Sequence, residues 1–281
     1  MTDAPLTARG RHLSPVPVAP ETYVLQGIHG EGEGPLAVHM NAMLIRGAEP
    51  VLVDTGAPVD RLSILDQVFG LVEPEDVRWI FITHDDVDHY GNLGELMELC
   101  PRATLVASWY LTQRLSADGP LPSMDRWRWV GDGEAFDAGD RVLRAIRPPL
   151  YDSPTTRGLL DMSTGVYWAS DCFSTPVPTA TAFVDELDPD VWADGFMAFQ
   201  KWNSPWVDLV DGPRFHAEVE RLRALGLSTI ATCHGPTIGS AMVDRAFELM
   251  HAVPVASVPA QPGQPVLEEI VAAMMAEAQP V

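Results

Sequence analysis

The stretch His84-Asp85-Asp86-Val87-Asp88-His89 follows directly on residues 77–83, an apolar run that predicts a buried strand. A tight loop directs alternate side chains to one side, which pairs His84 with Asp86 and Asp88 with His89. Two such pairs of imidazole and carboxylate predict two adjacent metal positions. The alternative is a solvated polar turn before the next helix, and we favour this ordinary turn role for Asp85 alone.

Two more candidate ligands follow strands that lie far along the chain. Asp171 comes just after the predicted strand 165–169, and His234 comes just after the predicted strand 228–232. Strand ends on one side of a sheet converge on a crevice in α/β folds, so these side chains are expected beside the loop. The alternatives are a turn cap for Asp171 and a structural role for His234.

Apolar periodicity predicts helices that alternate with two groups of strands, which indicates an α/β protein with an αββα sandwich. We expect residues 127–130 and 141–146 to belong to the second sheet, and residues 1–20 to form a loose N-terminal arm before a single domain over 21–281. The other predicted strands are 22–28, 40–46, 50–53 and 104–107, and the predicted helices are 59–69, 91–99, 109–115, 189–202, 213–225, 241–250 and 267–278.

Composition narrows the classes of partner. The chain has 281 residues and a formal net charge of -21, which argues against nucleic acid and against anionic membrane as partners. The three cysteines show no CxxC spacing, which fits a reducing compartment. The first 20 residues lack the apolar stretch of a signal peptide, and no apolar run reaches the ~18 residues of a membrane helix. We therefore expect a cytoplasmic protein.

The order of these motifs resembles that of the metallo-β-lactamase superfamily across nearly the whole chain. The order is Asp54-Thr55-Gly56, then His84–His89, then Asp171, then His234-Gly235-Pro236. The ordinary hydrolases of that superfamily carry H-x-H-x-D-H, whereas Asp86 replaces the second histidine here. This loop looks like the H-x-E-x-D-H of the flavodiiron branch and its stand-alone oxygen-binding diiron relatives. Residues 41–45, 171–173 and 199–202 are also similar to that branch.

The resemblance implies a metallo-β-lactamase-like domain over 21–281 with two metal positions. It implies His84, Asp86 and Asp171 at one metal, and Asp88, His234, Asp171 and His89 at the other. Carboxylate is a harder ligand than imidazole and suits iron or manganese better than zinc, although zinc stays open. Two divalent ions bring four positive charges against three negative ones from Asp86, Asp88 and Asp171.

One histidine of the flavodiiron pattern is missing. The family has His-Trp-Pro-Asp-Ser, and the matching stretch here is Pro149-Leu150-Tyr151-Asp152-Ser153. Because proline cannot bind metal, either the first position is weak or another group replaces the imidazole. The candidates are Asp152, Tyr151, His29 and His39, with a surface or supporting role as the alternative for each; Tyr90 is a candidate pocket residue.

These features favour a non-heme, diiron-type protein that binds or reduces oxygen, nitric oxide or a related small molecule. Two alternatives remain open: a zinc-dependent hydrolase of an ester, lactone or thioester, and an oxygen sensor without turnover. The sequence shows no Gly-rich phosphate loop and no flavodoxin-like domain after residue 260. We therefore expect no flavin on this chain and expect electrons to come from a partner protein.

Overall fold

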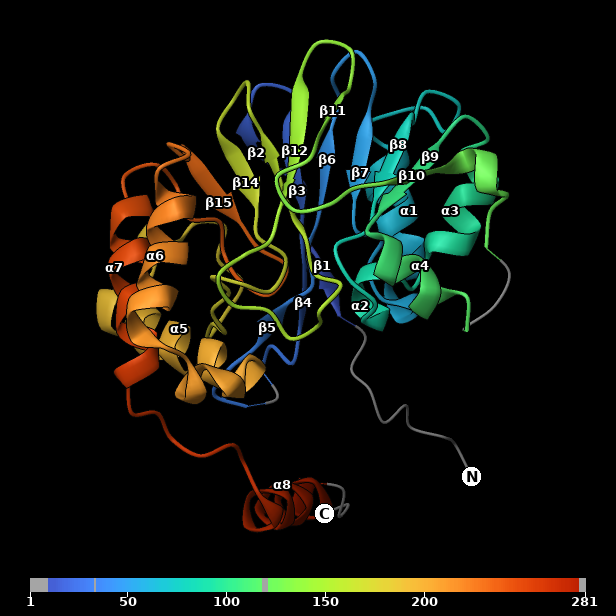
Figure 1. Cartoon of the computed structure of the whole chain (residues 1–281). Helices are drawn as coiled ribbons and strands as arrows, with labels where there is room; N and C mark the ends of the chain where they lie inside the picture. The colour runs from blue at the N-terminus through green and yellow to red at the C-terminus, as the bar shows by residue number, and fades with distance from the viewer. Residues whose placement is uncertain (1–9, 33, 118–120, 278–281) are drawn as a thin grey trace.

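Two β-sheets face each other in a computed structural model that describes residues 10–32, 34–117 and 121–277 (Figure 1). In this described part, the first sheet has seven strands in the order β10-β9-β8-β7-β6-β3-β2. Its strands are β2 (Val16–Ala19), β3 (Thr22–Leu25), β6 (Ala42–Ile45), β7 (Val51–Val53), β8 (Trp79–Phe81), β9 (Thr104–Ala107) and β10 (Trp127–Trp129).

The second sheet has five strands in the order β11-β12-β13-β14-β15 within the described residues. These are β11 (Ala135–Asp137), β12 (Val142–Ile146), β13 (Gly158–Asp161), β14 (Val166–Trp168) and β15 (Thr229–Ala231). A small third sheet, in the order β1-β4-β5, joins Arg11–His12, Gly27–His29 and Val38–His39.

Helices cover the outer face of each large sheet. In Figure 1, α1, α3 and α4 lie beside β8 to β10, and α5, α6 and α7 lie on the opposite side beside β14 and β15. The αββα sandwich is therefore confirmed. The α-helices are α1 (Arg61–Phe69), α2 (Val87–Tyr90), α3 (Leu93–Leu99), α4 (Trp109–Leu115), α5 (Pro189–Asn203), α6 (Gly212–Arg223), α7 (Val243–Ala252) and α8 (Gln264–Glu277). Short 3-10 helices span Pro58–Asp60, Met124–Arg126, Val184–Glu186, Pro205–Leu209 and Val253–Val255.

Strand β6 shows why the buried strands are apolar throughout. Successive side chains of a strand point to opposite faces of the sheet. Ala42 and Leu44 pack in the cluster under α1, α3 and α4, whereas Met43 and Ile45 pack in the cluster between the two sheets. Because both faces of the central strands are covered, period-2 alternation is absent and the sequence reads as continuous apolar runs.

Two details differ from the sequence predictions. Residues 127–130 were expected in the second sheet, but β10 pairs in parallel with β9 in the first. Part of the predicted loose arm is paired, since β1 lies against β4 and β2 against β3; residues 1–9 lie outside the described residues. Backbone pairing with a distant strand is invisible to local periodicity. The extent of a single domain over 21–281 remains a prediction.

The helix expected over 267–278 forms as α8. Helix α8 lies apart from the sandwich in Figure 1, and its apolar side chains Leu267, Ile270 and Val271 are about half exposed. Residue 278 itself lies outside the described part of the chain. None of the helices in the ranges described above is both long enough and apolar enough to cross a membrane.

The fold brings two pairs of parallel strands to the same end of the sandwich. β7 and β8 are parallel neighbours in the first sheet, and β14 and β15 are parallel neighbours in the second. The polar segments 54–56, 83–89, 170–171 and 232–235 follow these four strands. The carboxyl ends of parallel strands in an α/β fold form the usual ligand crevice.

Candidate metal centre

The loop after β8 begins with His84 and continues into the short helix α2. Asp86 is the residue before that helix, and its extended backbone (φ -83°, ψ 142°) turns the chain into it. Asp88 and His89 then lie on the first turn. Asp171 follows β14 and His234 follows β15, so two sheets contribute to one centre, as the strand ends predicted.

One group of candidate ligands contains His84, Asp86 and Asp152, whose ligand atoms lie within 4.8 Å of one another. His84 Nε2 is 3.7 Å from Asp86 Oδ2 and 3.6 Å from Asp152 Oδ2. The imidazole is fully buried, whereas the Asp86 side chain is 56% exposed. This group therefore opens to solvent on the Asp86 side.

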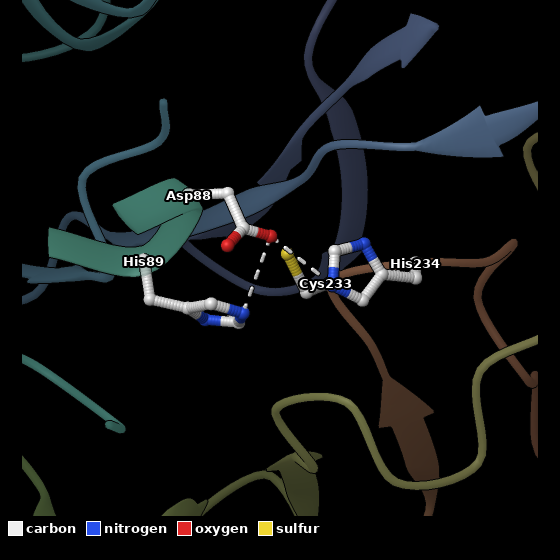
Figure 2. A group of neighbouring side chains, drawn as sticks. All are labelled: Asp88, His89, Cys233 and His234. Carbon is white, nitrogen blue, oxygen red and sulfur yellow. Dashed lines mark ion pairs between the residues drawn. The ribbon is translucent and has the colours of Figure 1, made fainter. Parts of the chain in front are cut away.

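A second group contains Asp88, His89, Cys233 and His234, again within 4.8 Å of one another (Figure 2). Asp88 Oδ2 is 3.6 Å from His89 Nε2 and 3.2 Å from His234 Nε2. The two rings meet edge to face, with their centroids 5.7 Å apart. Two imidazoles and a carboxylate thus point toward one volume.

Asp171 lies between the two groups. Its Oδ2 is 3.9 Å from His84 Nε2, on the side of the first group. Its Oδ1 is 2.9 Å from His89 Nε2 and 3.3 Å from His234 Nε2, on the side of the second. A carboxylate in this orientation presents one oxygen to each position.

Three buried atoms that face the centre make no hydrogen bond of good geometry: His84 Nε2, His89 Nε2 and Asp171 Oδ1, the last two of which lie 2.9 Å apart. A buried polar atom without a partner costs about 1–3 kcal/mol, so such atoms are rare in folded proteins. Their convergence on a common volume is the arrangement that a bound cation would satisfy. The donor set of imidazole nitrogens and carboxylate oxygens therefore fits a metal.

The other ring nitrogen of each histidine is held by a group outside the centre. His89 Nδ1 donates to Asp54 Oδ2 at 2.9 Å, and His234 Nδ1 donates to the His39 carbonyl at 3.0 Å. His84 Nδ1 lies 3.1 Å from the hydroxyls of Thr83 and Ser170. Such contacts fix the tautomer that leaves Nε2 free for a metal.

The Asp54 carboxylate accepts several of the hydrogen bonds that support the centre. It is fully buried and adopts a positive φ of 60°. Besides His89 it accepts hydrogen bonds from the Thr83 amide at 2.9 Å, the Thr83 hydroxyl at 3.0 Å and Trp168 Nε1 at 3.0 Å. The carboxylate therefore links the loop 83–89, which follows β8 of the first sheet, to β14 of the second.

Asp85 fastens the loop from its outer side. Its Oδ1 accepts hydrogen bonds from Ser153 Oγ at 2.7 Å and Thr155 Oγ1 at 2.8 Å, and Arg114 pairs with Oδ2. These contacts hold the loop 83–89 against the segment that bears Asp152. The turn role favoured for Asp85 from sequence is thus a contact between two segments of the centre.

The charges of the centre shift the pKa values of its members. Burial and the neighbouring His89 lower the pKa of His84, but Asp152, Asp171 and Asp86 outweigh them and raise it to about 10. Burial raises the pKa of Asp171, but His234 and His89 outweigh it, and the pKa lies well below the ordinary range. The buried carboxylates therefore favour positive charge at the centre, which a proton on the imidazoles or a bound cation would supply.

Comparison with known proteins agrees with this fold. Residues 37–149 match the family model described as "Metallo-beta-lactamase superfamily". The putative diflavin flavoprotein A 1 of a Nostoc species is 26% identical over 204 residues, which are 70% of this chain and 33% of that protein. The chain thus spans about one third of the length of the first curated relatives it matches.

Two solved structures share the architecture. The flavodiiron protein of Giardia intestinalis superposes with a TM-score of 0.73 at 17% identity, over 87% of this chain and 60% of that one. The rubredoxin oxygen:oxidoreductase of Desulfovibrio gigas superposes with a TM-score of 0.70 at 16% identity, over 85% and 61%. The chain therefore has a metallo-β-lactamase fold, which it shares with these two structures. At these identities, the structural likeness concerns the fold alone.

The flavodiiron resemblance makes Pro149 the replacement of a family histidine. In the structure, Pro149 lines a neighbouring cavity of about 480 Å³ together with Tyr151 and Trp206. Asp152, three residues later, is the residue of that stretch that lies beside His84. Among the candidates for the missing imidazole, Asp152 is therefore the one that the structure brings to the first group.

The remaining candidates lie elsewhere among the described residues. Tyr151 stacks at a tilt on Trp206, with ring centroids 5.0 Å apart, and faces the neighbouring cavity. Tyr90 packs against the apolar cluster under α1 and α3. His29 pairs with Asp60 at 2.8 Å. His39 is buried beside the centre and contributes its carbonyl to His234, and burial lowers the pKa of its ring to about 4.

Sequence reasoning did not assign a supporting role to Asp54, Thr83 or Ser170. Asp54-Thr55-Gly56 was part of the motif order, but as the end of a strand. The signal that could have found it is a carboxylate that follows a buried apolar strand, next to a parallel strand that ends in the metal loop. Ser170 precedes Asp171 and carries the same kind of signal.

Proposed function

We propose that this chain holds a dinuclear non-heme metal centre, preferably of iron, that binds or reduces oxygen or a related small molecule. The first metal position consists of His84, Asp86 and Asp152; the second consists of Asp88, His89 and His234; and Asp171 bridges them.

The orientation of Asp171 is the single observation that most supports two positions. A centre for one ion would gather all ligands around one volume. Instead, Oδ1 of Asp171 lies near His89 and His234, and Oδ2 lies nearest His84. Two ions joined by a carboxylate would satisfy both oxygens and both sets of imidazoles.

The ligand set supports iron or manganese at the first position. One imidazole and three carboxylates, counting the bridge, form a hard, oxygen-rich set. The four carboxylates, Asp86, Asp88, Asp152 and Asp171, balance the four charges of two divalent ions. A centre with four carboxylates favours a higher oxidation state of the metal more than a centre with the three carboxylates of the motif. It also makes a zinc-bound water less acidic. Iron, when bound, supplies the electron transfer that oxygen reduction needs.

The exposure of the ligands indicates how a small molecule reaches the centre. His84 and His89 are fully buried, Asp152 is 18% exposed and Asp86 is 56% exposed. We therefore propose that a small molecule would approach the first group from the side of Asp86. We also propose an electron-donor protein as partner, a view supported by the name of the Desulfovibrio gigas relative, which pairs rubredoxin with oxygen chemistry.

Metal analysis of the chain purified from its native host tests this proposal. We expect about two iron ions per chain and a visible oxo-to-iron absorption. Asp86→Ala and Asp152→Ala should each lower the metal content toward one ion per chain, whereas Asp66→Ala, an exposed carboxylate on α1, should leave it unchanged. One ion per chain in the native protein, or two zinc ions with turnover of esters, would contradict the proposal.

A further inference from the structure

Cys233 is a member of the second group that the proposed ligand set does not use. Its thiol lies within 4.8 Å of the ligand atoms of Asp88, His89 and His234. Figure 2 shows its sulfur turned toward the Asp88 carboxylate, with the rings of His89 and His234 on either side. The residue is fully buried, so its sulfur faces the protein interior.

We propose that the thiolate of Cys233 is a ligand of the second metal, beside Asp88, His89 and His234. This inference rests on the proposed function insofar as a metal must occupy the centre. The thiol loses its proton to solvent as the metal binds, and a sulfur-to-metal bond forms. The sulfur–metal bond replaces the weak hydrogen bond that the thiol donates to the Asn41 carbonyl at 3.3 Å.

The backbone holds Cys233 rigidly in this place. Its amide donates to the Ser170 carbonyl at 2.9 Å, and its carbonyl accepts from the Asn41 amide at 3.0 Å. The Asn41 side chain also donates to the carbonyls of Thr232 and Gly235, on both sides of the cysteine. The loop that contains Cys233 and His234 is therefore preorganised, and both side chains reach the same volume.

With the bridging Asp171, five donors surround the second position. Two imidazole nitrogens, two carboxylate oxygens and one thiolate sulfur form a mixed set of ligands that zinc, cobalt or ferrous iron accepts. The first position has one imidazole and carboxylates only. With Cys233 as a ligand, the two positions differ in softness, and the second should hold a thiophilic ion more tightly than the first.

Cys172 provides an internal comparison. It also neighbours a proposed ligand, Asp171, and it is buried. It packs in the apolar cluster under α5 to α7, however, and it is not a member of any potential ligand group found among the described residues. Position next to a ligand in the sequence is therefore insufficient, and the geometry separates the two cysteines.

Cobalt substitution tests the proposal on the full chain. Cobalt bound by a thiolate absorbs in the near-ultraviolet through charge transfer from sulfur, whereas cobalt bound by nitrogen and oxygen shows only weak visible bands. We expect the near-ultraviolet band in the wild-type protein and in Cys172→Ser, and its loss in Cys233→Ser. The zinc-loaded wild-type protein should show sulfur at about 2.3 Å in X-ray absorption, one sulfur per chain and therefore an average of half a sulfur per zinc when both positions are filled. This measurement needs no variant.

The outcomes separate this inference from the proposed function. If cobalt binds with visible bands but without the sulfur band, the metal centre stands and the role of Cys233 is refuted. A sulfur band that persists in Cys233→Ser also refutes it. If the wild-type protein binds no metal at all, both proposals fail. If Cys233→Ser does not fold, the X-ray absorption of the wild-type protein decides.

Discussion

Replacing Asp54 by asparagine removes a negative acceptor behind His89 while preserving the size of the side chain. Asparagine also tolerates the positive φ of this position better than most residues. Asp54 Oδ2 accepts from His89 and Trp168, and Oδ1 accepts from the Thr83 amide. Whichever way the new amide turns, its NH₂ group faces a donor.

Two consequences follow from that conflict. His89 can move its proton to Nε2, which then blocks the second metal position, or a buried donor remains unpaired. Loss of a supporting contact of this kind weakens metal binding about 10–100-fold, equivalent to about 1.4–2.7 kcal/mol. An unpaired buried donor costs a further ~1–3 kcal/mol of folding stability.

Chelator competition with zinc or cobalt measures the affinities of the two positions, and urea unfolding measures stability. We expect Asp54→Asn to weaken the second position and to leave the first within a few-fold of wild type. Asp161→Asn is the matched control. Asp161 is equally buried and accepts from Arg141 Nη1 at 3.0 Å and from the Ser163 amide at 2.8 Å, but it lies on β13. The Asp161→Asn variant should have a lower free energy of unfolding but unchanged affinity for metal. Wild-type affinity at the second position in Asp54→Asn would refute the reasoning.

Three further predictions concern other parts of the chain. The Ala180 amide and two side chains lower the pKa of Glu31 from 4.5 to about 2. The contribution of Glu31 to stability is therefore present above pH 4.5 and is lost as the pH falls toward 2, so unfolding midpoints of wild type and Glu31→Gln should converge across this window; a constant difference would contradict the assignment. Asp85→Asn should loosen the segment of Asp152 and weaken the first metal position selectively in chelator titrations, whereas equal weakening of both would argue against this. Phe247→Ala, in the core under α6, should lower the free energy of unfolding by about 3–5 kcal/mol without changing metal content; a loss below ~1 kcal/mol would mean that this core relaxes around the gap.

Much of the secondary structure follows from local patterns. The helices over Arg61–Phe69 and Gly212–Arg223 bury one face each and begin or end within about two residues of the periodic segments. Strand β8 lies within the apolar run that precedes the metal loop. Strand β10 shows the limit of such patterns, because the sheet that a short strand joins depends on a partner elsewhere in the chain.

Some of the candidate ligands can likewise be recognised from local sequence patterns, and others cannot. The loop 84–89 could be recognised because its ligands are neighbours in the sequence. Asp171 and His234 could be recognised because each follows a strand and completes a motif order. Asp152 was one of several candidates, and its distance of 3.6 Å from His84 separates it from Tyr151, His29 and His39. No sequence spacing encodes that distance, since it depends on where two loops meet.

The stretch His84–His89, placed after a buried strand, specifies imidazoles and carboxylates at a strand end, and local patterns are enough to recognise this. How these groups are divided and supported depends on the tertiary structure. Asp54 is 35 residues from His89 and 114 from Trp168, yet it binds both. Cys233 and Cys172 look alike in sequence, and only one of them points toward the ligands. The physical reason is that packing two sheets face to face brings distant strand ends together, and no local pattern of residues records that meeting.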